Sequence, residues 1–364
     1  MRTFRSAVHV ATLALIAVTA CSACSAAGGT VIVTTTVTSN PIAAGGGSAD
    51  AAPPAPSTDE PNPTGTVSDA PSPGVSSPPG DGPSDPATPS SATSASAPPK
   101  PVHVSTFEGD GKTYGVGMAV MVLLSAAPTD SSAFTKAAKV TVNGTPANGA
   151  WFWQQPTLPG YKMEALYREK GYWPAHSTIA VDLPLQGLSA GAGLAYDDSL
   201  TVTFKIGASH ISYVNSAQHQ MTVTDDSNVV QNFPVSLGAA TTPTYDGTKV
   251  VMEKKNPVEM KSDPGEADPY DIMVPWSVRI TNSGEFVHAA SWNTGNIGSH
   301  NTSHGCTNLN LSDAEWFYKF SQIGDVVRYT DANPKGTVQP SWDGWGWWNL
   351  SWSQWSRGGE LLNH

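Results

Sequence analysis

The amino-acid sequence predicts a mainly β protein with two folded units and a short helix. Short segments in which apolar and polar side chains alternate run through residues 102–331, and turn residues bound them. A clear helical signal follows Cys306, the one cysteine of that region. The chain has 364 residues, which is more than one ordinary domain requires, so we expect two folded units and additional unfolded segments.

The first twenty residues are predicted to be an export signal. Arg2 and Arg5 supply a positive start, and an apolar run at residues 10–18 ends in small side chains. This run is shorter than the roughly 20 residues that span a bilayer, which favours cleavage over a transmembrane anchor. The segment that ends at Cys21 resembles a bacterial lipoprotein processing site, and Cys24 is a poorer match. We therefore expect an exported protein whose Cys21 carries a lipid on the outer face of the cell membrane.

Residues 21–101 are predicted to be a disordered tether. They consist mostly of Ala, Pro, Ser, Gly and Thr, and much of the chain's total of 34 Gly and 30 Pro lies here. Such a segment cannot bury enough apolar surface to offset the entropy of ordering. The net charge of −11 argues against a nucleic-acid partner, because nucleic acids bind clusters of Lys and Arg.

Residues 102–208 are predicted to form a β-sandwich. Their clearest strands are bounded by turn residues such as Asn143-Gly144 and Gly207, and none has a helical period. These strands are Lys139–Val142, Thr178–Leu183 and Leu200–Ile206. No convergent set of titratable groups stands out, so this unit is interpreted as a spacer or docking domain.

Residues 209–331 are predicted to form a second β-rich unit with one helix. Its expected strands are Ile211–Val214, His219–Val223, Lys249–Glu253, Ser277–Ile280 and Phe286–His288. The helix is signalled by the capping-box spacing of Ser312 and Glu315, and Leu311 and Trp316 are placed for a hydrophobic staple. Gly324 is a candidate for its C-terminal end.

Cys306 is the candidate nucleophile of this unit. Two of the three cysteines lie at the processing point, which leaves Cys306 as a lone thiol, although a disulfide with Cys24 is an alternative. A nucleophilic thiol needs a neighbouring imidazole, and His288 or His304 fits this role. Gly305 permits close backbone approach to a substrate, and amides around the cysteine are candidate oxyanion donors. The bland alternative is a pair of core histidines beside a buried thiol.

A metal site is the other alternative for this cluster. His300, His304 and Cys306 have a spacing that zinc ligands use on a helix. Gly305 and the surrounding Ser, Thr and Asn argue against a helix there, and no fourth ligand is evident. We therefore expect neither a metal nor another cofactor, and His300 is interpreted as a surface loop residue.

Several segments together resemble the L,D-transpeptidases of the YkuD type, which cross-link peptidoglycan. The main one is Ser303–Asn308, with the sequence SHGCTN, preceded by His288. Phe233–Gly238 resembles the family's entry strand, Gly171–Pro174 its immunoglobulin-like accessory domain, and Trp347–Trp355 the Trp-rich C-terminal extension of the mycobacterial branch. The resemblance implies an immunoglobulin-like β-sandwich at 102–208, a catalytic domain at 209–331 and an extension at 332–364.

The resemblance also assigns roles to individual residues. Cys306 would be the nucleophile and His288 the general base, oriented by the backbone carbonyl of Ala289, where the mycobacterial branch usually has Ser. His304 and Gly305 would line the oxyanion side. The residues implied in substrate binding are Tyr270, Ser283, Gly284, Trp292, Ser303 and Asn308, with Met252 at a lid position.

The implied reaction is acyl transfer in two steps. Cys306 would displace the terminal D-alanine of a tetrapeptide stem, and a side-chain amine of a neighbouring stem would take the thioester to give a 3-3 cross-link. Carbapenems are expected to acylate the same thiol. The alternatives are an L,D-carboxypeptidase, in which water replaces the amine, and a non-catalytic wall-binding lipoprotein.

The C-terminal extension has six Trp between Trp342 and Trp355. They could stack on sugar rings as a glycan-binding element. Packing against the catalytic domain is favoured, because so many exposed Trp would promote aggregation.

Overall fold

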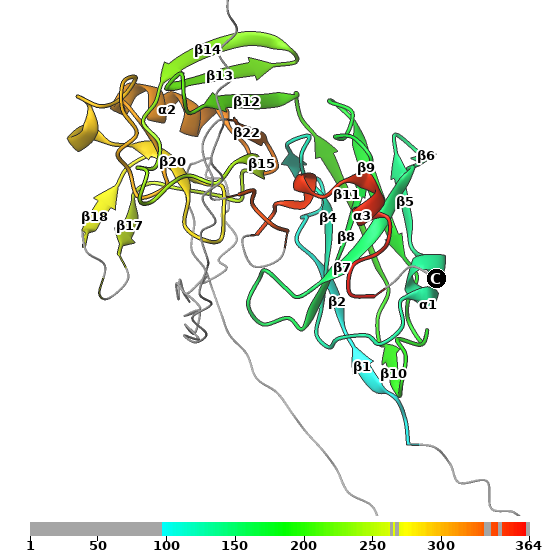
Figure 1. Ribbon diagram of the computed structural model, residues 1–364. Helices are drawn as coiled ribbons and strands as arrows, with labels where there is room; N and C mark the ends of the chain where they lie inside the picture. The colour runs from blue at the N-terminus through cyan, green and yellow to red at the C-terminus, as the bar shows by residue number, and fades with distance from the viewer. Residues whose placement is uncertain (1–96, 263–264, 266–268, 331–335, 341–343, 362–364) are drawn as a thin grey trace, which may run out of the picture. The chain divides into compact units, whose positions relative to one another are not determined.

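The computed structural model describes residues 97–262, 265, 269–330, 336–340 and 344–361, all within one unit at Ser96–His364 (Figure 1). The predicted export signal, Cys21 and nearly all of the predicted tether lie outside the described residues. Within the described ranges no helix is both long and apolar enough to cross a membrane.

The first domain is a β-sandwich whose two main sheets share one apolar core. One sheet has the strand order β2-β4-β8-β7, with β2 (Val104–Thr106), β4 (Val120–Leu124), β8 (Met163–Glu169) and β7 (Gly149–Gln154). The other has the order β3-β11-β9-β5-β6, with β3 (Thr113–Tyr114), β11 (Leu200–Ile206), β9 (Thr178–Leu183), β5 (Lys139–Val142) and β6 (Thr145–Pro146). A short parallel pair joins β1 (Lys100–Val102) to β10 (Leu194–Tyr196), and α1 is Ser132–Ala137.

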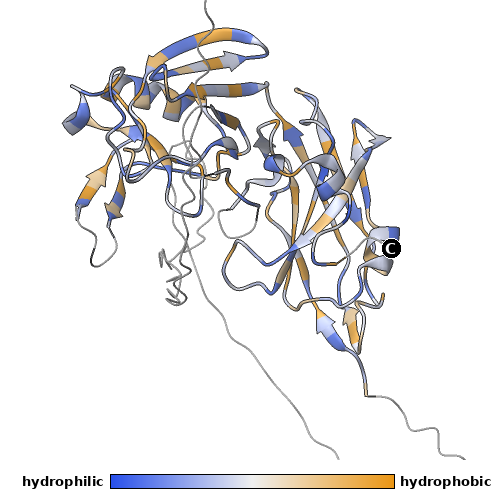
Figure 2. Ribbon diagram, viewed as in Figure 1, coloured by the Kyte–Doolittle hydropathy of each residue, from blue (hydrophilic) through white to orange (hydrophobic). Residues whose placement is uncertain are grey.

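The alternation of apolar and polar residues explains why these strands form a sandwich. In β11, Val202, Phe204 and Ile206 are buried while the residues between them are exposed, so one face turns to the core. Figure 2 shows hydrophobic and hydrophilic residues following one another along the strands. Phe134 of α1 packs edge-on against Trp151 and Trp153 of β7, with ring centroids 4.9 Å apart in both pairs. The predicted sandwich is confirmed, and its three clearest strands have the predicted bounds.

The second domain contains two larger sheets and a hairpin. The first sheet has the order β14-β13-β12-β22-β15, with β14 (Asn228–Pro234), β13 (Gln220–Asp225), β12 (His210–Asn215), β22 (Val326–Thr330) and β15 (Gly247–Val250). The second has the order β16-β19-β20-β21, with β16 (Glu253–Lys255), β19 (Ser277–Arg279), β20 (Phe286–Ala289) and β21 (Thr307–Leu309). The hairpin consists of β17 (Val258–Lys261) and β18 (Asp271–Val274), and α2 (Leu311–Phe320) lies against β20.

The predicted strand Lys249–Glu253 is divided between these two sheets. β15 ends at Val250 and pairs with β22, whereas β16 begins at Glu253 and pairs with β19. Between them, the Val251 amide donates to the Asp325 carbonyl and the Met252 amide to the Arg279 carbonyl, both at 2.9 Å. The chain therefore changes sheets without a turn residue, and an apolar run alone does not signal such a crossing.

The helix after the cysteine is confirmed, but its predicted ends are wrong. Asn310 is the N-cap residue, and Ser312 lies inside the first turn instead of capping it. Glu315 pairs with Lys319 at 2.6 Å, so it is not available for a capping box. The helix ends at Phe320, and Gly324, with φ +94°, forms a later turn that leads into β22.

The Trp-rich extension packs against the protein, as predicted, but mainly on the sandwich and not on the second domain, where it was expected. Trp345, Trp347 and Trp355 are almost completely buried. The Trp347 indole donates to the Gly117 carbonyl at 3.0 Å, and Trp355 stacks on Phe152 with centroids 4.7 Å apart. The short helices of this segment are η2 (Trp347–Asn349) and α3 (Trp352–Trp355), and Trp342 lies outside the described residues.

Candidate active site

The candidate base and the candidate nucleophile lie on two neighbouring strands of one sheet or directly before them. His288 lies on β20, and Cys306 directly precedes β21. The two strands are parallel, with Val287 opposite Thr307 and His288 opposite Asn308. Continuing this register by one residue sets Cys306 beside Phe286. Because side chains alternate between faces, Cys306 and His288 share one face of neighbouring strands, with their Cα atoms about 8 Å apart by strand geometry. The topology thus brings together two residues separated by a long loop.

His288 is buried and held in one orientation. Its Nδ1 lies 2.9 Å from the backbone carbonyl oxygen of Ala289, which only accepts hydrogen bonds. Nδ1 must therefore carry the proton in the neutral ring, which leaves Nε2 with a free lone pair. Burial lowers the pKa of His288 to about 4, although the Ala289 carbonyl favours the protonated form. At neutral pH the ring is an uncharged base.

Cys306 is a free, partly exposed thiol. Its Sγ donates to the backbone carbonyl of Gly284 at 3.6 Å, a contact that favours the protonated sulfur. Although the residue is partly exposed, the protein around its sulfur excludes water, and this burial is the largest cause that raises the pKa of the Cys306 thiol. The charge of Glu285 adds to it and the Phe286 amide, Lys249 and Arg279 oppose it, which together put the pKa at about 12. The resting pair is thus a neutral thiol and a neutral imidazole, so attack requires a proton transfer from sulfur.

The loop before Cys306 is held by hydrogen bonds to its own residues and to neighbouring ones. The Ser303 hydroxyl donates to the Cys306 carbonyl at 2.6 Å and accepts from the Gly305 amide at 3.1 Å. The Thr244 hydroxyl donates to the Gly305 carbonyl at 2.7 Å. Gly305 has φ +129°, a conformation that is essentially restricted to glycine. The Ser303 hydroxyl therefore holds the backbone of Gly305 and Cys306 in place by hydrogen bonds within the loop.

Ser283 and Gly284 form the turn between β19 and β20. Gly284 has φ +98°, and the Ser283 hydroxyl donates to the Thr281 hydroxyl at 3.1 Å. The Glu285 amide donates to the same Thr281 oxygen at 2.8 Å, which closes the turn. The turn thereby places the Gly284 carbonyl against the sulfur.

Three of the predicted site residues carry exposed or half-buried aromatic rings. Trp292, in η1 (Ser291–Asn293), is 58% exposed and stacks on His288 with centroids 5.9 Å apart. His304 is exposed, and its ring centroid lies 5.0 Å from that of Tyr270, next to the β17–β18 hairpin. These rings mark the side of the site that a substrate can approach.

Asn308 and Met252 lie inside the protein. The Asn308 carboxamide accepts from Asn293 Nδ2 at 3.3 Å, and its backbone is paired with Ser236. Met252 is 8% exposed and belongs to the apolar core shared with the sandwich. Both side chains are therefore buried, and the substrate-binding role of Asn308 and the lid role of Met252 stay predictions.

Sequence reasoning missed a buried ion pair behind the nucleophile. Lys249 Nζ lies 2.5 Å from Glu285 Oε2, and both side chains are almost fully buried. The sequence contained one available signal for this pair: a charged residue stands just before each of the apolar pairs Val250-Val251 and Phe286-Val287. Charged residues next to buried apolar ones are seldom buried unless they are paired. The opposite signs of the two charges point to a pair.

No group of three or more His, Cys, Asp and Glu suited to a metal occurs in the described part of the chain. His300 is exposed, and its Nδ1 lies 3.0 Å from the Ser299 hydroxyl in the adjacent loop. His304 faces Tyr270, as described above. The His and Cys residues considered as zinc ligands therefore do not converge.

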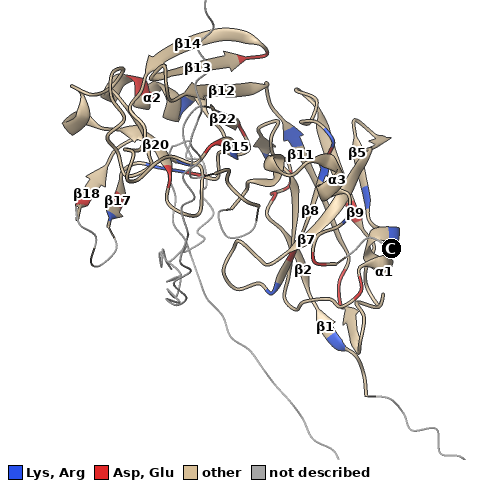
Figure 3. Ribbon diagram, in the orientation of Figure 1, with Lys and Arg blue, Asp and Glu red and all other residues tan. Residues whose placement is uncertain are grey.

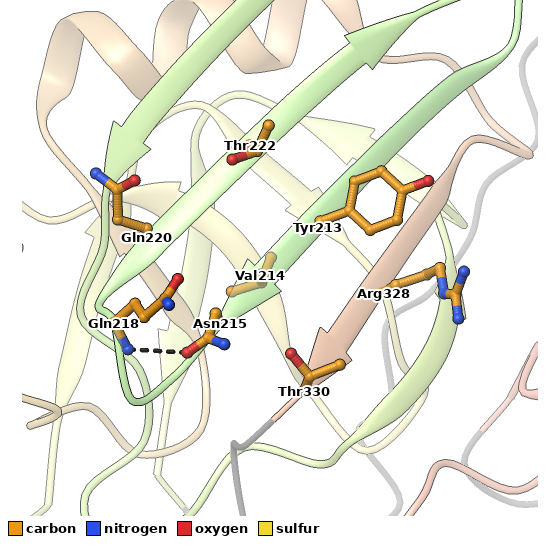
Figure 4. A pocket seen from close by; sticks show the side chains of 8 residues that line it. All are labelled: Tyr213, Val214, Asn215, Gln218, Gln220, Thr222, Arg328 and Thr330. Carbon is orange, nitrogen blue, oxygen red and sulfur yellow. Dashed lines mark hydrogen bonds between the residues drawn. The ribbon is translucent and has the colours of Figure 1, made fainter. Parts of the chain in front are cut away.

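A separate cavity of about 300 Å³ lies over β12, β13 and β22 (Figure 4). Tyr213 and Arg328 form one side of it, with the guanidinium carbon 5.8 Å from the ring centroid. None of the predicted site residues lines this cavity. Lys and Arg in the described residues are spread over many elements and do not gather on one (Figure 3).

Comparison with known proteins identifies the family to which the chain belongs. Residues 209–328 match the model of the L,D-transpeptidase catalytic domain, and residues 81–189 match that of a bacterial Ig domain. Probable L,D-transpeptidase 3 of Mycobacterium tuberculosis is 32% identical over 244 residues, which cover 60% of this chain and 82% of the relative. The chain belongs to the L,D-transpeptidase family.

Other family members differ from the chain in length. L,D-transpeptidase 2 of M. tuberculosis is 32% identical over 266 residues, which are 71% of this chain but 63% of that protein. For L,D-transpeptidase 5 of the same species the chain spans 56% of the relative. The aligned region therefore covers somewhat more than half of these two relatives.

Solved transpeptidase structures share the fold. An LD transpeptidase in complex with imipenem is 26% identical and has a TM-score of 0.54, covering 64% of this chain and all of that one. L,D-transpeptidase 3 from M. tuberculosis, in complex with a faropenem-derived adduct, is 28% identical with a TM-score of 0.51, covering 62% and 97%. The family and the mainly β, two-domain fold predicted from the sequence are thus confirmed.

Proposed function

We propose that this chain is a cysteine acyltransferase that forms 3-3 cross-links between peptidoglycan stem peptides. The observation that carries the proposal is the arrangement of His288 and Cys306. The Ala289 carbonyl fixes the imidazole so that Nε2 is the free base, and the thiol shares its sheet face on the next strand. In the first step His288 would act as the general base and Cys306 as the nucleophile.

In the first half-reaction the Cys306 sulfur attacks the carbonyl carbon that precedes the terminal D-alanine of a tetrapeptide stem. The thiol proton passes to His288 Nε2, and the carbonyl oxygen becomes an oxyanion. The Gly305 amide is already engaged with Ser303, so we assign the oxyanion to the amide of Cys306. Collapse breaks the peptide bond, His288 returns the proton to the leaving amine, and D-alanine departs.

In the second half-reaction the thioester transfers the acyl group to a side-chain amine of a neighbouring stem. The amine attacks the thioester carbonyl and gives its proton to His288, and the sulfur leaves and recovers a proton. A new amide bond replaces the one that was broken. The covalent intermediate retains the bond energy between the two steps, so no nucleotide is consumed.

The neutral resting state has a consequence for this chemistry. With the pKa of the thiol raised to about 12 and that of His288 lowered to about 4, a resting thiolate–imidazolium pair is disfavoured. Proton transfer would therefore accompany the attack on the carbonyl instead of preceding it. Trp292, which covers one face of the imidazole, would keep water from this transfer.

The proposed location of the enzyme follows from the N-terminal residues. An export signal at residues 1–20, a lipid on Cys21 and a tether that ends before β1 at Lys100 would hold the folded domains outside the membrane and within reach of the wall. A Cys21→Ala variant is expected to leave the membrane fraction. If that variant stays membrane-associated, the lipid anchor is rejected.

The test of the proposed reaction is product analysis with a disaccharide-tetrapeptide donor. The protein should release D-alanine and form a cross-linked dimer, whereas Cys306→Ala should form neither. His300→Ala, which changes an exposed loop residue, is the matched control and should retain activity. Release of D-alanine with a tripeptide as the main product would instead identify a carboxypeptidase, and no release at all would identify a non-catalytic wall-binding protein.

A further inference from the structure

A buried ion pair lies directly behind the proposed nucleophile. Lys249 on β15 is fully buried, and its Nζ lies 2.5 Å from Glu285 Oε2, whose side chain is 6% exposed. The other carboxylate oxygen accepts from the Tyr245 amide at 2.8 Å. A buried pair of this kind is costly to desolvate and is a weak source of stability. Its position therefore suggests a role beyond folding.

Glu285 lies beside the residue before Cys306, and Lys249 is linked through Tyr329 to the residue after it. A Cβ built on Gly305 would lie 3.7 Å from Glu285 Cγ and Oε1, so the carboxylate lies against the residue before the nucleophile. Lys249 Nζ lies 3.8 Å from the centroid of the Tyr329 ring. The Tyr329 hydroxyl is 2.7 Å from that of Thr307, the residue after the nucleophile. The two charges thus reach the segment around Cys306 from both ends.

The charged groups facing this segment have opposite effects on the sulfur. Glu285 opposes a negative charge on Cys306, while Lys249 and Arg279 favour it. The charge of Asp246 acts on Lys249 in the same sense as that of Glu285 and favours the ammonium form. His288 is the uncharged neighbour on β20. Because the carboxylate and the ammonium oppose each other in a buried site, removing either one alone should have a large effect.

We propose that Lys249 and Glu285 are positioning residues that set the charge on the nucleophile of the proposed transpeptidase. The Glu285 carboxylate adds to the effect of burial in keeping the resting sulfur protonated, and the Lys249 ammonium stabilises the negative charge that develops on the sulfur during attack. The inference rests on the proposed function for its meaning in catalysis. Its physical content, the control of thiol ionisation, is measurable without any substrate.

The test is the pH profile of iodoacetamide alkylation at Cys306 between about pH 7 and 10. In this range the rate is proportional to the thiolate fraction, so a sideways displacement of the profile measures the change in its midpoint. The full chain is used in a Cys21→Ala, Cys24→Ala background, which leaves one thiol. Glu285→Gln should move the midpoint of the profile to lower pH by about one unit or more, and Lys249→Met should move it to higher pH by a similar amount. The double variant should return toward the parent. Lys319→Met, which removes the ammonium of an exposed pair on α2, should leave the midpoint unchanged.

Shifts of opposite sign support the inference, because a merely structural role predicts shifts in the same direction or none. Midpoints that stay within the error of the parent, or that move together, overturn it. If Lys249→Met does not fold, Glu285→Gln decides alone, and an unchanged midpoint rejects the proposal. If the variants shift in opposite directions but the parent protein makes no cross-links, the proposed function is rejected and this inference stands. If the parent makes cross-links but the variants do not shift, this inference is rejected and the proposed function stands.

Discussion

At the scale of single residues, the site depends on groups whose ionisation differs from that in water. His288 is buried as a neutral ring, and Lys249 and Glu285 are buried as a pair. The motif around Cys306 indicated Cys306 and His288 as the candidate nucleophile and base, and the fold brings these two residues to neighbouring chain segments. The ion pair was not predictable in this way, because its partners are 36 residues apart, one on β15 and the other just before β20, and only the three-dimensional fold brings them together.

His288 should make the stability of the protein depend on pH in acid. Its pKa in the folded state is about 4, below the ordinary value of 6.5, so the unfolded state binds more protons between these values. The contribution is complete above pH 6.5 and is lost as the pH falls toward 4, by roughly 3 kcal/mol. The free energy of unfolding of the wild type and of His288→Asn is measured in urea at several pH values in this range. The contribution of His288 is the difference between the slopes of the two curves of free energy against pH.

The variant is needed for comparison because other titratable groups change the free energy of unfolding with pH in the opposite direction. Burial raises the pKa of Glu108 to about 8, so its contribution is lost as the pH rises. Glu108 is the same in both proteins and cancels. Equal slopes in the wild type and in His288→Asn would show that the imidazole is not buried as a neutral group.

Removing one member of the ion pair should destabilise the fold, while removing both should not. Lys249→Met leaves an unpaired carboxylate and is expected to cost about 3–5 kcal/mol. Lys249→Met combined with Glu285→Met should recover most of this free energy of unfolding. Lys261→Met, from an exposed pair, is the control and should cost less than about 1 kcal/mol. Additive losses in the double variant would contradict the pairing.

At the scale of elements, periodicity predicted strands where one face meets a core and failed where the chain changes sheets. The sandwich strands β5, β9 and β11 alternate cleanly and were predicted to the residue. The crossing at Val251–Met252 and the N-cap at Asn310 were missed, because hydrogen bonds to distant segments decide the first and because a better capping motif two residues later obscured the second. Element ends thus depended on context that a local pattern does not contain.

The turn between β19 and β20 should require glycine at position 284. Gly284 has φ +98°, and a Cβ there would meet no atom within 4 Å, so Gly284→Ala tests backbone conformation alone. The expected cost is about 1–2 kcal/mol, with faster alkylation of Cys306, because the Gly284 carbonyl favours the protonated thiol. Gly295→Ala, also in open space but without a positive φ, is the control. Equal effects of the two substitutions would contradict this role of the turn.

At the scale of the whole molecule, the Trp-rich extension links the C-terminal end of the chain to the sandwich. Asn349 exchanges hydrogen bonds with the backbone of Thr248 on β15, while Trp355 packs on Phe152 of β7. One segment thus contacts both domains. The composition predicted that these Trp would be buried, but it did not indicate the surface that buries them.

Deleting residues 338–364 should lower thermal stability as well as activity. The deletion removes three buried indoles and leaves their pockets on the sandwich empty. Trp355→Ala alone should cost about 3–5 kcal/mol and lower the Tm by roughly 10 °C. Trp292→Ala, at a 58% exposed ring, is the stability control and should change the Tm much less. Unchanged stability with lost activity would instead favour glycan binding by the extension.

The central claim is that the Cys306 sulfur is the group that becomes acylated, and intact mass spectrometry after incubation with a carbapenem tests it most directly. The wild type should gain the mass of one carbapenem. His288→Ala should gain it far more slowly, because the base is missing, and Cys306→Ala should gain nothing. Equal labelling of wild type and Cys306→Ala would contradict the account.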